Sequence, residues 1–231
     1  MDHLSPLSQA EIETRSFIQK VYGWMCTGLL VTGACAAYMA SDEHMIRNLV
    51  GNRMLFYGLL IAELGLVFWL AGWVERMEAS TAKFAFLFYS ALNGVTMSVI
   101  FLIYTRGSIA NAFFLTAGLF GVMSAYGYMT KTDLTSVGNF CFMGLLGIIM
   151  ASVANWWLKS PAIEWFTTYA GILIFIGLTA YDTQKIKRLN KIGNEGTDED
   201  TKEAISGALT LYLDFVNLFL KLLSATGKRR D

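Results

Sequence analysis

The chain alternates between long apolar stretches and short polar connections. A transmembrane helix needs about 20 mostly apolar residues, and seven stretches meet that requirement. They cover residues 18–40, 54–74, 84–105, 108–129, 135–158, 163–184 and 205–223. Helices satisfy their own backbone hydrogen bonds in lipid. The pattern therefore predicts an all-α integral membrane protein, a seven-helix bundle surrounded by the lipid bilayer.

The polar connections leave no room for a soluble domain. The chain divides into a polar N-terminal segment (1–17), a seven-transmembrane-helix domain (18–223) and a short basic tail (224–231). The N-terminal segment lacks the basic region and short apolar core of a cleavable signal peptide. The longest connection, 185–204, is basic in its first half and acidic in its second. We expect its acidic cluster, 198–200, to lie in a solvated loop, with weak binding of a cation as the alternative.

Composition supports a membrane protein and argues against one class of partner. Only 16% of the 231 residues are charged and 55% are hydrophobic, whereas about a quarter of a soluble domain is charged. The formal net charge is zero, which argues against a nucleic-acid partner. The three cysteines lie in apolar stretches and form no CxxC motif, so they are expected to be packing residues. They are Cys26, Cys35 and Cys141.

Lysine and arginine are distributed unevenly among the connections. With a cytoplasmic N-terminus, the cytoplasmic connections carry eight of these residues and the opposite connections carry four. Cytoplasmic connections are usually the richer ones. The count favours a cytoplasmic N-terminus and a C-terminus on the other side.

Small residues form three short motifs within the predicted spans. They are GACAA at 33–37, GLFG at 118–121 and GLLG at 144–147. Small side chains let helices approach closely in lipid, where apolar burial gives little driving force. The motifs predict close helix contacts at these positions.

The seventh span carries a polar stripe. Its polar and small residues recur at spacings of three and four, which places them on one helix face, opposite Leu, Phe and Val. Lipid would exclude such a face, so we expect this helix at the centre of the bundle, with the stripe lining a pore. A hydrogen-bonded interface without a pathway is the alternative. The stripe consists of Gly207, Thr210, Asp214, Asn217, Lys221 and Ser224.

Three acidic residues lie inside predicted spans: Glu63, Asp182 and Asp214. An ionisable group costs at least ~2.5 kcal/mol at mid-bilayer, so each is a functional candidate. Asp182 and Asp214 come from the same side of the membrane and could share a level. Two close carboxyls in a dry place hold a single proton, which suits a pH sensor. Alternatively, Asp182 is a helix-terminal acid that is exposed to water or paired with Lys185.

The same two acids are hard oxygen ligands of the kind that Ca²⁺ prefers, so Asp182 and Asp214 are also the candidate metal ligands. The chain contains no HExxH, GxSxG or Walker pattern. The acid pair resembles that of presenilin-type proteases, but Leu-Tyr-Leu precedes Asp214 where those enzymes have Gly-x-Gly. We therefore expect no enzymatic activity and no cofactor.

Two segments carry a family resemblance. AYDTQKIK (180–187) and LYLDFVNLFLKLL (211–223) resemble the paired signature of the Bax inhibitor-1 family of seven-helix membrane proteins. Stretches at 62–68, 87–105 and 125–148 agree, and the resemblance covers nearly all of the chain beyond residue 20. The compact connections and the short basic tail look most like the bacterial branch, which implies the bacterial inner membrane.

The resemblance implies a pH-sensitive calcium leak with the last helix at the centre. Its gate is a pair of aspartates that match Asp182 and Asp214, and calcium is the transported ion. In the family a basic residue of the second helix bonds to this pair in the closed pore. Arg76 is the candidate, and Glu63 matches an acidic position of the same helix.

Two other functions stay open at this point. Family members have been linked to restraint of cell death or of membrane proteases. The chain could therefore be a regulatory protein that binds a membrane protease or cell-death machinery without conducting ions. A proton-coupled transporter is a third possibility.

Overall fold

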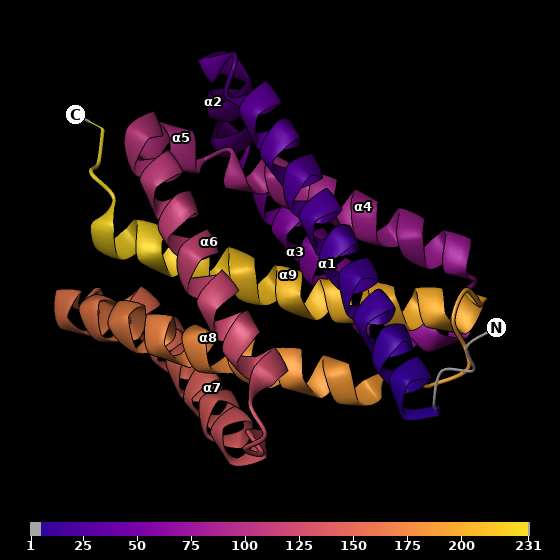
Figure 1. Cartoon of the computed structure of the whole chain (residues 1–231). Coiled ribbons are helices and arrows are strands. Elements are labelled where there is room, and N and C mark those ends of the chain that lie inside the picture. The colour runs from indigo at the N-terminus through magenta and orange to yellow at the C-terminus, as the bar shows by residue number, and fades with distance from the viewer. Residues whose placement is uncertain (1–5, 231) are drawn as a thin grey trace. The chain divides into compact units, whose positions relative to one another are not determined.

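The computed structural model describes residues 6–230 and is helical almost throughout (Figure 1). No strand occurs in this described part, as the sequence predicts. The helices are α1 (Pro6–Met39), α2 (Glu43–Gly51), α3 (Arg53–Trp73), the 3-10 turn η1 (Val74–Arg76), α4 (Ala79–Met97), α5 (Ile100–Ile103), α6 (Arg106–Met129), α7 (Thr135–Leu158), α8 (Pro161–Leu189) and α9 (Asp198–Thr226). The predicted N-terminal segment and tail include residues 1–5 and 231, which lie outside the described residues.

Seven of the described helical segments are long and apolar enough to cross a membrane, in agreement with the seven predicted spans. The protein is thus an all-α integral membrane helical bundle. The third span differs from the prediction because the helix is interrupted between α4 and α5. At the interruption the Ser98 hydroxyl donates to the Val95 carbonyl (2.6 Å), a local bond that competes with regular helix geometry.

The last two spans are longer than predicted, so the connection between them is short. α8 continues to Leu189 and takes up the basic residues after 184, and α9 begins at Asp198. The prediction that residues 198–200 lie in a solvated loop is therefore wrong. Acidic residues in the first turn and basic residues in the last turn both suit the helix dipole, which explains why the helices extend into these charged segments.

Two compact units divide the chain. The first contains the described residues up to Ile103 together with Leu189–Tyr212. Within it α1 packs along α4 at Gly94, where a side chain would collide with the Thr32 backbone. The Tyr212 hydroxyl hydrogen-bonds to Thr32 Oγ1 (2.7 Å), and its ring meets the edge of Phe86. These contacts anchor the first half of α9 in this unit.

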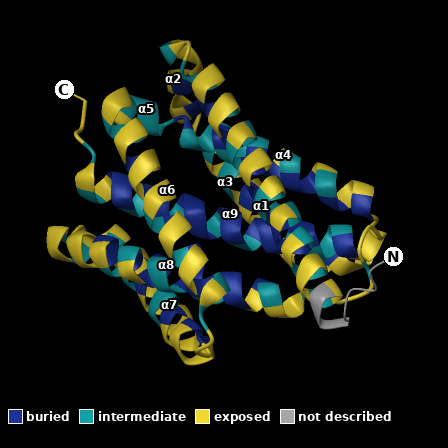
Figure 2. Cartoon of the chain, viewed as in Figure 1, coloured by how far each residue is buried: buried dark blue, intermediate teal, exposed yellow. Residues whose placement is uncertain are grey.

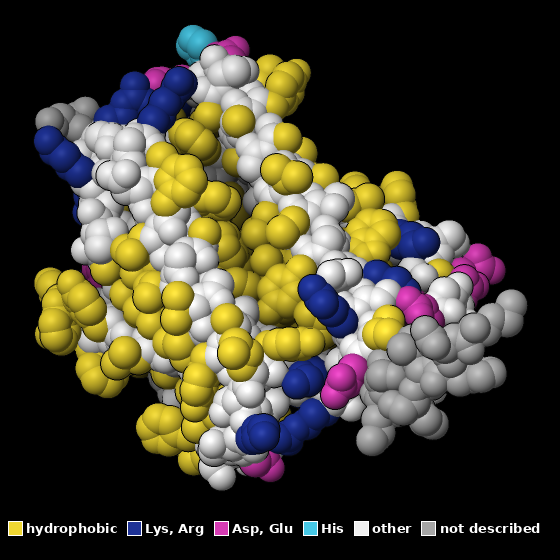
Figure 3. Space-filling view, in the orientation of Figure 1, with side chains coloured by type: hydrophobic (Ala, Val, Ile, Leu, Met, Phe, Trp, Pro, Cys, Tyr) yellow, Lys and Arg dark blue, Asp and Glu magenta, His cyan; other side chains and the backbone are white. Residues whose placement is uncertain are grey.

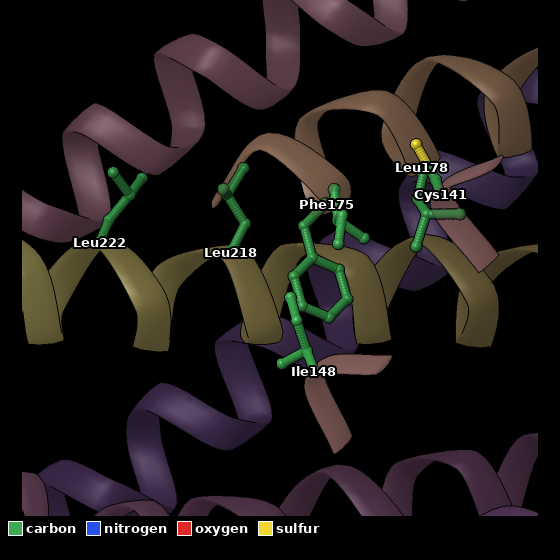
Figure 4. Packing of buried hydrophobic residues seen from close by; sticks show 7 residues of the cluster. Cys141, Ile148, Phe175, Leu178, Leu218 and Leu222 are labelled. Atoms are coloured by element: carbon green, nitrogen blue, oxygen red, sulfur yellow. The ribbon is translucent and has the colours of Figure 1, made fainter. Parts of the chain in front are cut away.

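The second unit contains Tyr104–Arg188 and the described residues from Leu213 onward. α7, α8 and the second half of α9 share an apolar cluster here (Figure 4). The chain after α9 pairs with the start of α6, because the Thr105 N–H donates to the Lys228 carbonyl (3.1 Å). The cluster consists of Cys141, Ile148, Ile174, Phe175, Leu178, Leu218 and Leu222.

The three predicted motifs differ in whether they make close helix contacts. At Gly33, Gly118, Gly121 and Gly147, a β-carbon would have no described neighbour within 4 Å, so the prediction is wrong for GLFG. In GLLG, a β-carbon at Gly144 would meet Ile174, and in GACAA the Cys35 side chain lies against Gly94. Further tight contacts occur at a set of glycines outside the motifs, because spacing alone does not tell which helix face meets a neighbour. This set consists of Gly28, Gly94, Gly127, Gly138 and Gly177.

Burial varies strongly among the seven spans (Figure 2). In α9 61% of the most apolar window is buried, against 39% in α8 and 11% in the span that begins at Arg53. Large hydrophobic side chains are exposed on the other helices, as expected for contact with lipid (Figure 3). The central position of α9 and the cytoplasmic location of the N-terminus stay predictions.

Candidate functional site

Two carboxyl groups meet between α8 and α9 in the second unit. Asp182 and Asp214 are close enough to form a hydrogen bond with each other. Both are buried, with 8% and 5% of their surface exposed. The structure therefore brings together the two acids that the sequence singled out.

The helix periodicity explains how the pair is placed. Asp182 follows Leu178 by four residues on α8, and Asp214 precedes Leu218 by four residues on α9. Side chains four apart lie on the same helix face. The two leucines belong to the apolar cluster shared by these helices (Figure 4). The carboxyls therefore continue that apolar contact and are shielded from lipid.

The surroundings of the pair leave one carboxyl oxygen without a hydrogen bond in the described structure. That oxygen is Asp214 Oδ2, which is buried. Cys141, on α7, lies near enough for its thiol to interact electrostatically with both carboxyls. Lys185 interacts electrostatically with Asp182, and its ammonium group lies 5.9 Å from the centre of the Tyr181 ring.

This arrangement suits the storage of one proton. Two charged carboxylates in contact repel strongly in a low-dielectric interior, whereas a shared proton joins them by a hydrogen bond. The oxygens also suit a hard cation. Among the described residues, no group of three or more His, Cys, Asp and Glu side chains could hold a metal ion.

The other two predicted gate residues lie in the first unit. Glu63 is buried on α3, where the Thr96 hydroxyl donates to its Oε1 (2.8 Å). Arg76 lies in η1 and is exposed. Their roles as partners of the carboxyl pair stay predictions.

The polar stripe of α9 is less buried than its apolar face. Thr210, Asn217 and Lys221 are half-buried, whereas Leu218 on the apolar side is fully buried. The Thr210 hydroxyl and the Asn217 amide donate to carbonyls of their own helix, at 3.1 and 2.8 Å. The Lys221 stem lies against Gly171 of α8. A pore-lining role for these residues stays a prediction.

Two residues near the pair gain importance only from the structure. Cys141 was expected to be a packing residue, and it is indeed buried, but it also borders both carboxyls. Gln184 is buried two residues after Asp182 and hydrogen-bonds to the connection between α6 and α7. In the sequence, the only indication of a role for Gln184 is that a polar residue stands close to the end of a predicted span. The sequence gives no indication of a role for Cys141 beyond packing.

Comparison with known proteins places this membrane bundle in a family. The family described as "Inhibitor of apoptosis-promoting Bax1" matches residues 14–231. The chain belongs to this family, the Bax inhibitor-1 family, in agreement with the resemblance seen in the sequence.

Bacterial relatives match nearly the whole chain. "Inner membrane protein YbhL" of Escherichia coli is 48% identical over 230 residues, which cover 97% of this chain and 98% of the relative. An uncharacterized protein of Borreliella burgdorferi is 42% identical over the full length of both chains. An uncharacterized protein of Rickettsia prowazekii is 44% identical over 218 residues, or 94% of this chain and 91% of the relative.

Proposed function

We propose that this protein is a pH-sensitive cation leak, with calcium as the transported ion and the Asp182–Asp214 pair as its gate. The observation that carries the proposal is the buried contact of two carboxyls between membrane-spanning helices, with one oxygen that has no partner among the described residues. Ionisable groups in such positions are expensive and usually functional. The name of the Escherichia coli relative supports a bacterial inner-membrane location.

The proposed gate works by a shift between two populations. With a shared proton, the pair joins α8 to α9 and the contact stays dry. Loss of the proton leaves two adjacent negative charges, which repel each other and admit water between the helices. Among the described residues, the Cys141 thiol on α7 and the Lys185 ammonium on α8 interact electrostatically with the pair. Arg76 and Glu63 are proposed as further partners that stabilise the closed state.

Passage of calcium requires weak contacts rather than a resident site. Carboxylate oxygens replace part of the hydration shell of Ca²⁺. Conduction requires binding that is favourable enough for entry and weak enough for exit. A single carboxyl pair meets both requirements better than a full coordination shell would.

The test is calcium flux into dye-loaded liposomes that contain the purified protein, from about pH 5 to about pH 8. Wild-type flux is expected to vary with pH, whereas Asp182→Asn and Asp214→Asn each remove that dependence because neither mutant pair can titrate as before. Asp198→Asn is the matched control, since Asp198 is an exposed acid in the first turn of α9. It keeps the wild-type profile.

Two outcomes contradict the proposal. A wild-type pH profile in both gate variants excludes the carboxyl pair as the gate. A complete absence of ion flux at every pH favours the alternative, a regulatory protein that binds a membrane protease or cell-death machinery. The family description, which names an inhibitor, supports that alternative. Saturable flux that requires a proton gradient identifies a transporter instead.

A further inference from the structure

A buried glutamine at the end of α8 holds the connection between α6 and α7. Gln184 Nε2 donates to the Thr132 carbonyl (2.8 Å), and the Leu134 N–H donates to Gln184 Oε1 (2.9 Å). The Gln184 side chain is only 5% exposed, and Leu134 is also buried. The amide nitrogen and the amide oxygen of Gln184 therefore both form hydrogen bonds with the same backbone segment. A side chain that only donates or only accepts cannot make both bonds.

Two charged side chains in the last turn of α8 strengthen the same contact. The Lys187 ammonium donates to the Tyr128 carbonyl (2.9 Å) and lies 4.6 Å from the centre of the Tyr128 ring. Arg188 forms an ion pair with Asp133 (3.1 Å). The same Asp133 oxygen accepts the Thr135 N–H (3.0 Å) at the start of α7. The end of α8 is therefore tied to the end of α6 and to the start of α7.

We infer that Gln184 is a positioning residue for the carboxyl pair, an inference that rests on the proposed function where flux is measured. Gln184 follows Asp182 by two residues, and each residue of an α-helix turns about 100°. The two side chains therefore point to different sides of α8, Asp182 toward α9 and Gln184 toward the α6–α7 connection. Fixing Gln184 fixes the rotation and height of α8, and with them the contact between Asp182 and Asp214.

The accessibility of the Cys141 thiol measures whether the contact between Asp182 and Asp214 is open, and this measurement does not require ion flux. Cys141 is 4% exposed, lies against Gly177 of α8 and borders the carboxyl pair. A charged thiol reagent reaches it only when water enters between α7 and α8. Cys26 is exposed and Cys35 is half-buried, so both are replaced by serine in every protein to be compared. Cys141→Ser in the same background shows the labelling that does not come from Cys141.

The first comparison is the labelling rate of Cys141 by a charged methanethiosulfonate reagent in wild type and in Gln184→Met. Methionine keeps the size of glutamine and loses both hydrogen bonds. Loss of two buried hydrogen bonds is expected to increase labelling roughly tenfold, because the opened state gains population. Gln19→Met, the same substitution at an exposed position on α1, keeps the wild-type rate.

A second variant distinguishes a loosened contact at Gln184 from a general loss of folding. Gln184→Glu keeps the shape of the side chain, and its protonated form can still donate to Thr132 and accept from Leu134. Its charged neighbours are Lys187 and Arg188 on α8 and Asp133 on the connection. Relative to wild type at each pH, labelling is expected to be normal when the glutamate is protonated and fast when it is ionised. A merely unfolded protein labels fast at every pH.

Flux measurements on the same proteins separate this inference from the proposed function. If wild type conducts with a pH profile, Gln184→Met is expected to leak more, with a shifted profile. Wild-type labelling and a wild-type profile in Gln184→Met overturn the positioning role while leaving the gate intact. If no protein conducts but Gln184→Met labels faster than wild type, the leak proposal fails and the positioning role stands.

Discussion

Asp214 presents the sharpest conflict between a side chain and its surroundings. One of its oxygens is buried and has no partner in the part of the chain that the structure describes. An unsatisfied buried acceptor costs about 1–3 kcal/mol, more if it is charged. A proton shared with Asp182 reduces this cost, because it neutralises the pair and joins the two groups. Under the proposed function, protonation resolves this conflict and makes the contact dependent on pH.

Asp133, on the α6–α7 connection, makes the stability of the protein depend on pH in the acidic range. Hydrogen bonds from the Thr135 hydroxyl and backbone, followed by Arg188, lower the pKa of this exposed carboxyl. A lowered pKa gives stability that is complete above the unfolded value of about 3.9 and is lost as the pH falls through the folded value. Asp133→Asn is therefore expected to lose less stability than wild type on acidification below about pH 4.

Thermal unfolding in detergent at neutral and acidic pH measures this difference. The control is Arg188→Gln, which removes a weaker contributor and should reduce the acid sensitivity less than Asp133→Asn does. An equal loss of melting temperature in wild type and in Asp133→Asn would show that the Thr135 and Arg188 bonds do not stabilise the connection.

The two aspartates could be predicted from the sequence because an ionisable residue is conspicuous in an apolar stretch. The roles suggested for Cys141 and Gln184 could not be predicted in this way. A cysteine is ordinary in such a stretch, and its position beside the carboxyls depends on how α7 packs on α8. Gln184 acquires its role from two backbone groups of a connection that is distant in sequence.

The contact between α6 and α8 depends on backbone approaching backbone. Gly127 of α6 lies against the Ala180 carbonyl, so that a methyl group there would collide with it. Gly121 lies on the same helix, and a methyl group there would have no described neighbour within 4 Å. The same chemical change at these two positions therefore tests the packing of α6 on α8 directly.

Gly127→Ala is expected to destabilise the protein by ~1–3 kcal/mol, since the helices must move apart to accept the methyl group. Gly121→Ala is expected to be neutral or stabilising by up to ~1 kcal/mol, because alanine favours the helix and meets nothing. Unfolding in mixed micelles measures both. Equal effects of the two substitutions would show that α6 and α8 are not in close contact at Gly127.

The number of spanning helices could be predicted from the length of the apolar stretches, but their ends could not. Hydropathy drops at the charged segment after residue 184, whereas the helix continues because charges of the right sign favour its terminus. The interruption at Ser98, where the Ser98 hydroxyl donates to the Val95 carbonyl, has no hydropathy signal either. The close contact expected at GLFG was misplaced for a related reason: small residues permit approach without specifying a partner.

The predicted membrane orientation rests on the whole chain rather than on any one helix. An odd number of spans places the two termini on opposite sides, and the described helices include seven candidates. The positive-inside rule then selects between the two orientations by the excess of eight basic residues over four in the connections. Loss or gain of a single span would reverse the side of the C-terminus.

Reporter fusions test this orientation. A green fluorescent protein fused to the N-terminus is expected to fluoresce, and one fused after residue 230 is expected to be dark, because it folds poorly outside the cytoplasm. Alkaline phosphatase fused after residue 230 should be active, because its disulfides form only outside the reducing cytoplasm. Fusions within the α6–α7 and α7–α8 connections serve as controls, since they should behave like the N-terminal and C-terminal fusions respectively.

A fluorescent C-terminal fusion together with an inactive phosphatase would reverse the predicted orientation. It would also place the Gln184 end of α8 on the outer side, so that the carboxyl pair would respond to external pH.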